Sequence, residues 1–235
     1  LTTKGFELAI DFNHRFENGL GINFRANLDD SKSVFSGYTS LRTTGVNYNG
    51  RVYGDIWGYE TDRLYQYNDF VLDGNNNPQL VKPNADMTKY YGSTDNVYLL
   101  KEGPNGEKPV YQPRFQNSTN FYFGPGDVKF KDLNGDGEID NGDGTIDNPG
   151  DMKIIGNSTP RYQYGFRFGA DWKGFDVSAF FQGVGQRKVW GAGFLAIPGF
   201  NTSDGAMPAS FVNDYWTKDN QGAFYPAAFN NGGSA

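Results

Sequence analysis

Four segments of this sequence alternate apolar and polar side chains with a period of two, and this pattern constrains the fold more than any other feature. They form two pairs, within residues 1 to 30 and 161 to 185, and each pair is joined by a short turn, ENG or KG. Such alternation is typical of strands with one apolar and one polar face. The sequence therefore predicts two hairpins, whose apolar face carries Phe6, Leu8, Ile10 and Phe12, then Leu20, Ile22, Phe24, Ala26 and Leu28, then Tyr162, Tyr164, Phe166, Phe168 and Ala170, and then Val177, Ala179 and Phe181.

The length of these strands and the placement of their aromatic residues favour a membrane barrel. Each strand spans about ten residues, against a mode of about 5 to 6 in soluble sheets, and this length crosses a bilayer at a tilt. Arg, Asp and Asn in mid-strand suit a wet lumen, and Phe16, Trp172 and Phe175 lie near the turns, as in an interfacial girdle. The alternative is a large sandwich with one solvated face per sheet. We expect an all-β, antiparallel transmembrane barrel, of which this chain is a fragment, because the smallest such barrels need about eight strands.

The connections predict the domain organisation. Bacterial barrels have short periplasmic turns and long extracellular loops, so we expect residues 31 to 160 to form a long extracellular region between the two hairpins. A connection of this length needs its own fold, and short strands are expected within residues 51 to 60 and 95 to 100. Residues 186 to 235, rich in Gly, Asn and Pro, are expected to be a second extracellular loop that is truncated before its return.

Residues 132 to 143, DLNGDGEIDNGD, match the spacing of a calcium-binding loop. A 12-residue loop supplies oxygen ligands from positions 1, 3, 5, 7, 9 and 12, with glycine at 6. The predicted ligands are Asp132, Asn134, Asp136, the carbonyl of Glu138, Asp140 and Asp143. Gly137 occupies the turn, and Ile139 is the expected inward apolar anchor. The flanking sequences lack helical periodicity, so we expect a structural cation in an extracellular loop rather than a helix-opening sensor. The alternative is an acidic surface loop held by Asx turns.

Composition excludes several classes of function. The formal charge of -6 argues against nucleic acid as a partner. The absence of cysteine excludes a disulfide framework and thiol catalysis. No run of 18 apolar residues predicts a transmembrane helix. The single histidine, His14, lies at an apolar-face position near a turn, so a Ser-His-Asp triad is not indicated. We expect no enzymatic activity.

Aromatic residues cluster in the first part of the long connection. Trp57, Tyr59 and Tyr65 are candidates for stacking on sugar rings or contacting a partner, since surface loops often carry recognition. The alternative is that these rings form the core of the connection's own fold.

Three stretches in order, GDVKFKDLNGDGEID, IIGNSTPRYQYGF and DWKGFDVSAFFQGVG, resemble the late-barrel region of the SusC/RagA-like TonB-dependent transporters of Bacteroidetes. The resemblance implies a barrel of about 22 strands, an amino-terminal plug, a TonB-contacting segment and a SusD-like surface lipoprotein as lid. It also implies import of glycan oligomers or peptides across the outer membrane of a Gram-negative bacterium.

One departure from this family is GTIDNPGD after Asp143, which resembles an insertion and leaves open whether Asp143, Asp147 or Asp151 completes the cation site. A second class of function also remains, namely a calcium-stiffened extracellular adhesin or carbohydrate-binding β-domain.

Overall fold

The computed structural model describes residues 1–92, 96–113, 123–191 and 208–228. The chain divides into two compact units. We call Leu1–Trp57 together with Ile154–Val189 the sheet unit, and Gly58–Lys153 together with Trp190–Ala235 the loop unit. In the described parts of both, no helix has the length and apolar character needed to span a membrane.

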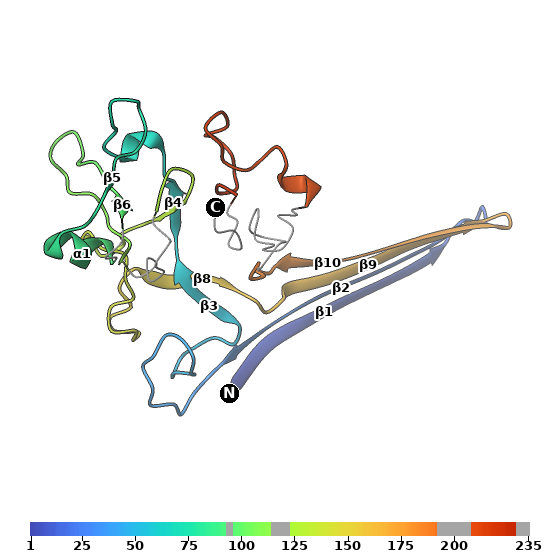
Figure 1. The fold of residues 1–235 in the computed structure, drawn as a ribbon. Coiled ribbons are helices and arrows are strands. Elements are labelled where there is room, and N and C mark those ends of the chain that lie inside the picture. The colour runs from blue at the N-terminus through green and yellow to red at the C-terminus, as the bar shows by residue number, and fades with distance from the viewer. Residues whose placement is uncertain (93–95, 114–122, 192–207, 229–235) are drawn as a thin grey trace. The chain divides into compact units, whose positions relative to one another are not determined.

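Four long antiparallel strands make up the sheet unit (Figure 1): β1 (Thr2–Arg15), β2 (Gly21–Val34), β9 (Arg161–Trp172) and β10 (Phe175–Gln186). They lie in the order β1-β2-β9-β10. The two predicted hairpins are therefore confirmed, and β2 continues past residue 30 to Val34. The β2–β9 ladder, with Gly21 opposite Asp171, joins the hairpins into one sheet.

The register brings the alternating residues of all four strands into common rows. Phe12 lies opposite Phe24, Phe24 opposite Phe168, and Phe168 opposite Ala179. Directly opposed residues of an antiparallel pair lie on the same face. The predicted apolar face is thus continuous across the sheet, and the alternate rows of charged and amide side chains form the other face.

The apolar face is open to its surroundings. Phe6, Leu8 and Ile10 are 51%, 52% and 50% exposed, and Phe166 and Phe168 are 38% and 45% exposed. A sandwich would bury one face of each sheet against the other. This exposure favours the wall of a barrel over a sandwich, although the four described strands form an open sheet with free edges at β1 and β10.

The turn between β9 and β10 explains why that hairpin is tight. Lys173 and Gly174 have φ values of 50° and 87°. Two successive residues with positive φ define a type I′ turn, whose twist matches that of the flanking strands. The KG dipeptide therefore closes the hairpin directly, and Lys173 Nζ lies 4.5 Å from the Trp172 ring centroid.

Shorter elements occupy the long connection between β2 and β9. The paired strands are β3 (Asp55–Tyr59) with β8 (Met152–Asn157), β4 (Thr61–Leu64) with β7 (Val128–Phe130), and β5 (Leu80–Val81) with β6 (Val97–Tyr98). The expected short strands within residues 51 to 60 and 95 to 100 thus correspond to β3 and β6. Helix α1 (Ala85–Tyr91) begins at the Asn84 side chain, which accepts from Met87 N, and ends at Gly92. Two 3₁₀ turns are η1 (Tyr67–Asp69) and η4 (Ala209–Phe211).

The loop unit has its own apolar core, drawn from both of its chain segments. The buried side chains are Tyr65, Phe70, Tyr91, Val97, Ile139, Phe211 and Trp216. Trp216 donates through Nε1 to Gln66 Oε1 at 3.1 Å, and its ring stacks on Tyr67. Ala227 N donates to Gly126 O at 2.9 Å. The segment after β10 therefore folds together with the connection between β2 and β9.

Candidate functional site

The sheet is crossed by arginine–aspartate pairs, two of them on its polar face and the third, between Arg161 and Asp30, at the end of the β2–β9 ladder. Arg15 Nη2 lies 2.8 Å from Asp171 Oδ2, and Arg25 Nε lies 2.5 Å from Asp11 Oδ1. Arg161 binds both oxygens of Asp30, each at 2.5 Å. The Arg25–Asp11 and Arg161–Asp30 pairs join neighbouring strands, and the Arg15–Asp171 pair spans β2 to join β1 with β9, so these three pairs tie β1, β2 and β9 together.

The loop from Asp132 to Asp143 is held by its side-chain oxygens. Asp132 accepts from Gly135 N at 2.6 Å and from Gly137 N at 2.8 Å. A shorter contact, from a backbone N–H to the side-chain oxygen two residues before it, recurs along the loop. It joins Asp136 N to Asn134 Oδ1 at 3.0 Å, Glu138 N to Asp136 Oδ1 at 2.9 Å, and Gly142 N to Asp140 Oδ1 at 2.7 Å. The loop is therefore held by a series of short-range hydrogen bonds from backbone N–H groups to its own side-chain oxygens.

Ile139 is fully buried, as expected of the anchor residue. Tyr111 pairs with the two residues that flank Glu138, since Ile139 N donates to Tyr111 O at 2.7 Å and Tyr111 N donates to Gly137 O at 2.8 Å. This short bridge ties the acidic loop to the core of the loop unit.

Asp151 is the carboxylate that closes this loop in the structure. It is fully buried and accepts from Leu133 N at 2.6 Å and from Asp140 N at 2.8 Å. Burial raises the pKa of this carboxyl, against the effect of the backbone N–H groups. Asp143 instead accepts from Thr145, through N at 3.1 Å and Oγ1 at 2.6 Å. Of the candidates for the last position, Asp151 therefore contacts the beginning of the loop and Asp143 does not.

The loop's donor set consists of carboxylate, amide and carbonyl oxygens, which are the ligands that hard cations take. In the described ranges, no group of three or more His, Cys, Asp or Glu side chains is arranged to hold a metal ion. Hydrogen bonds from the loop's own N–H groups account for the fold shown here, so the calcium site stays a prediction.

The three aromatic candidates have separate packing partners. Trp57 donates through Nε1 to Tyr48 OH at 3.1 Å. Tyr59 lies against Phe130, with ring centroids 5.6 Å apart. Tyr65 is 2% exposed and packs on Phe70 and Phe123, and burial raises the pKa of its hydroxyl. This placement favours the core alternative for Tyr65, whereas stacking on a ligand stays a prediction for Trp57 and Tyr59.

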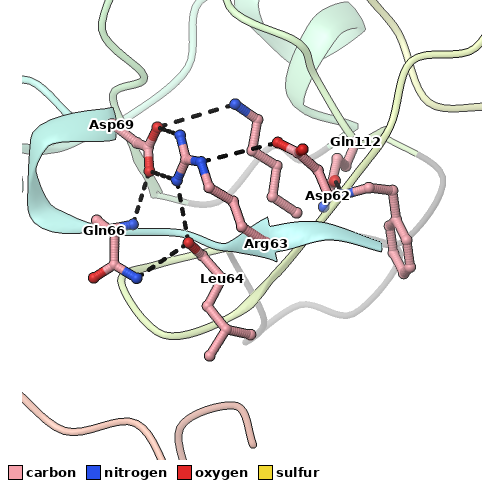
Figure 2. Close-up of polar contacts among 8 residues, drawn as sticks. Asp62, Arg63, Leu64, Gln66, Asp69 and Gln112 are labelled. Carbon is pink, nitrogen blue, oxygen red and sulfur yellow. Dashed lines mark hydrogen bonds and ion pairs between the residues drawn. The ribbon is translucent and has the colours of Figure 1, made fainter. Parts of the chain in front are cut away.

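An ion-pair network that was not expected from the sequence lies beside η1 (Figure 2). Arg63 binds Asp69 with both terminal nitrogens, at 2.6 and 2.5 Å, and Gln66 N donates to Asp69 at 2.7 Å. Lys129 Nζ lies 4.0 Å from the same carboxylate. Burial acts to raise the pKa of Asp69, but the Arg63 guanidinium and the Gln66 N–H outweigh it, so the pKa is lowered. Arg63 on β4 and Lys129 on β7 lie opposite each other, and Asp69 lies on η1, so the network depends on a pairing of distant short strands that spacing along the chain does not reveal.

A cavity of about 420 Å³ adjoins this network. Positively charged lysines and negatively charged carboxylates border it, together with Tyr65 and the turn that follows Lys101. Asp69 is the carboxylate of the network that borders this cavity, and Arg63 already binds it.

No protein-family model matches this chain. The chain is 26% identical over 196 residues to TonB-dependent receptor P3 of Formosa agariphila. The match covers 77% of this chain, and the chain spans about 15% of the length of this curated relative. The similarity favours the TonB-dependent receptors as the family of this chain, and it does not distinguish the SusC/RagA-like group among them.

Proposed function

We propose that this chain is part of a TonB-dependent outer-membrane importer of the SusC/RagA-like kind. The observation that carries the proposal is the single-layer sheet, whose strands of 12 to 14 residues expose a continuous apolar face. Strands of this length cross the apolar band of an outer membrane. The similarity to a TonB-dependent receptor supports the same assignment.

In this proposal the sheet unit is a section of the barrel wall and the loop unit stands outside the cell. The apolar face contacts outer-membrane lipid, and the polar face lines the lumen. A SusD-like lipoprotein covers the extracellular side, TonB acts through parts of the protein outside this chain, and the cargo is a glycan oligomer or a peptide. These partners rest on the resemblance of residues 126–140, 154–166 and 171–185 to that group of transporters.

We also propose that the loop from Asp132 to Asp140 binds a structural calcium ion. In this proposal Asp151, rather than Asp143, is the carboxylate that completes the site. Asp151 is buried and accepts a hydrogen bond from Leu133 N at the beginning of the loop. Calcium would offset the repulsion among these carboxylates. Its effect is to stiffen an extracellular loop rather than to open one.

The separate core of the loop unit favours a second candidate, a calcium-stiffened adhesin or carbohydrate-binding β-domain. Buried residues such as Phe70 and Val97 show that this unit packs apolar side chains of its own. An adhesin is soluble without detergent, whereas an importer with lipid-facing Phe6 and Phe166 is not.

The test is extraction of the full-length protein from membranes, followed by gel electrophoresis with and without heating. We expect the protein to require detergent and to migrate faster before heating, as folded barrels do. A second step is to identify the proteins and oligomers that copurify with it. Release into buffer without detergent, with the same mobility before and after heating, would favour the adhesin.

A further inference from the structure

Arg167 on strand β9 differs from the other arginines of the long strands. Arg15, Arg25 and Arg161 each bind an aspartate of another strand of the sheet, at 2.8 Å or less. Among the residues that the structure describes, the Arg167 guanidinium has no carboxylate and no hydrogen-bond partner, and it is exposed. The sheet thus supplies a counter-charge for its structural arginines and leaves this one open.

The strand register adds a second positive charge beside Arg167. Arg167 lies directly opposite Arg25, which in turn lies opposite Asp11. Like charges directly opposite each other in an antiparallel pair repel, and a single aspartate cannot neutralise two guanidinium groups. This row therefore carries a surplus positive charge, held at a fixed spacing by the β2–β9 ladder.

Neutral groups frame the two arginines. Glycines occupy both same-face neighbours of Arg167 on β9, Gly165 and Gly169. Side-chain amides lie over them, because a Cβ on either glycine would come within 2.8 Å of Asn27 or 2.7 Å of Asn23. Neither amide has a hydrogen-bond partner among the described residues. The surroundings are therefore rich in hydrogen-bond donors and free of a second carboxylate within the row.

An exposed aromatic ring completes the arrangement. Phe180 on β10 lies opposite Arg167 on the polar face and is 64% exposed. The row Asp11, Arg25, Arg167, Phe180 thus crosses all four strands and ends in an apolar surface beside the free guanidinium.

We propose that Arg167, supported by Arg25, binds an oxyanion of the imported molecule on the lumen wall. This inference rests on the proposed function, since only a barrel makes the polar face a lumen. Guanidinium groups bind carboxylate, sulfate and phosphate oxygens through directed, charge-assisted hydrogen bonds. Phe180 contacts the apolar part of the molecule next to the anion. The site selects an acidic oligomer over a neutral one of equal size.

The experiment measures binding of labelled oligomers to the purified full-length protein in detergent at constant ionic strength. The probes are two matched pairs: trigalacturonate with its neutral methyl ester, and hexaglutamate with hexaglutamine. The first pair reports a sugar source of the carboxylate and the second a peptide source. The variants are Arg167→Gln and Arg167→Lys, with Arg15→Gln as a control that removes one equal charge from the same face.

We expect the acidic member of at least one pair to bind more tightly than its neutral partner. Arg167→Gln should weaken that binding about tenfold, the value of one charge-assisted hydrogen bond. Arg167→Lys should retain part of the affinity, and Arg15→Gln should change it less than twofold. Binding of the neutral probes should stay the same in all variants.

Three results would overturn the proposal. The wild-type protein binds neither acidic probe better than its neutral partner. Arg15→Gln weakens binding as much as Arg167→Gln, which indicates a general charge effect. Arg167→Gln lowers the melting temperature and leaves probe binding unchanged, which indicates that a carboxylate of the protein itself occupies the site. Heat-modifiable mobility of the same samples reports separately on the barrel, so failure of the importer assignment is read independently of these outcomes.

Discussion

Phe168→Arg tests the assignment of the apolar face to lipid. Phe168 lies in mid-strand on β9, between Phe24 and Ala179 of the neighbouring strands. It is separated from the Lys173 turn by about five residues, or roughly 16 Å at 3.3 Å per residue. A strand tilt of about 40° places it roughly 13 Å above the turn, near the middle of an apolar band about 25 Å tall. An arginine at that depth costs about 2 to 4 kcal/mol, which shifts a folding equilibrium roughly 30- to 700-fold.

The matched control is Ser178→Arg, which introduces the same side chain on the opposite face of the adjacent strand, across from Gly169. We expect the control variant to assemble as the wild-type protein does, because its guanidinium enters the lumen. The assay is heat-modifiable gel mobility of the outer-membrane fraction after expression of each full-length variant. Equal folded fractions for Phe168→Arg and Ser178→Arg would refute the assignment of the faces.

Three further predictions concern the loop unit and its topology. A protease site or labelling tag within residues 74 to 77 should be reached on intact cells and one at Asn18 should not, and preferential labelling at Asn18 would invert the topology. Chelation of calcium, or Asp136→Ala, should increase proteolysis within residues 125 to 155 and leave the barrel's heat-modifiable mobility unchanged; a calcium titration without effect on cleavage would show that Asx turns alone hold the loop. Burial raises the pKa of Asp127 from its ordinary value of 3.8 to about 6. Between about pH 4 and 6 this carboxyl is therefore protonated in the folded chain and ionised in the unfolded chain. The loop unit should lose stability as the pH rises through this range. Asp127→Asn should remove that slope in thermal unfolding curves, and a slope that persists in the variant would assign it to another group.

The hairpins could be predicted because each strand separates two different environments. A one-residue slip would move Phe24 and Phe168 to the polar face, so the pattern determines register as well as strand type. The period of two does not identify which strands of different hairpins are neighbours. The β2–β9 pairing spans the whole long connection, and only the structure reveals it.

The loop unit was harder to predict for a different reason. The acidic loop repeats a local spacing, so its turns could be expected, and Ile139 is buried as that spacing requires. The contact of Asp151 with Leu133 joins two segments of irregular backbone, and the Arg63–Asp69 pair joins a short strand to a 3₁₀ turn, so neither follows from a periodic pattern. Tyr65 shows the same limit, because an aromatic residue in a loop sequence indicates equally a binding surface or a core, and burial decides between them.

The common core of the loop unit has a consequence for engineering this chain. Gly126, from the first connection, lies so close to Trp216, from the segment after β10, that a Cβ at this glycine would come within 2.5 Å of the indole ring. A chimera that receives a foreign segment 58–153 and retains the native residues 208–228 would therefore join two surfaces that were never fitted to each other. Recombination between homologous barrels should succeed when both segments are exchanged as one cassette, with crossover points in the long strands, where an alternating pattern tolerates different side chains.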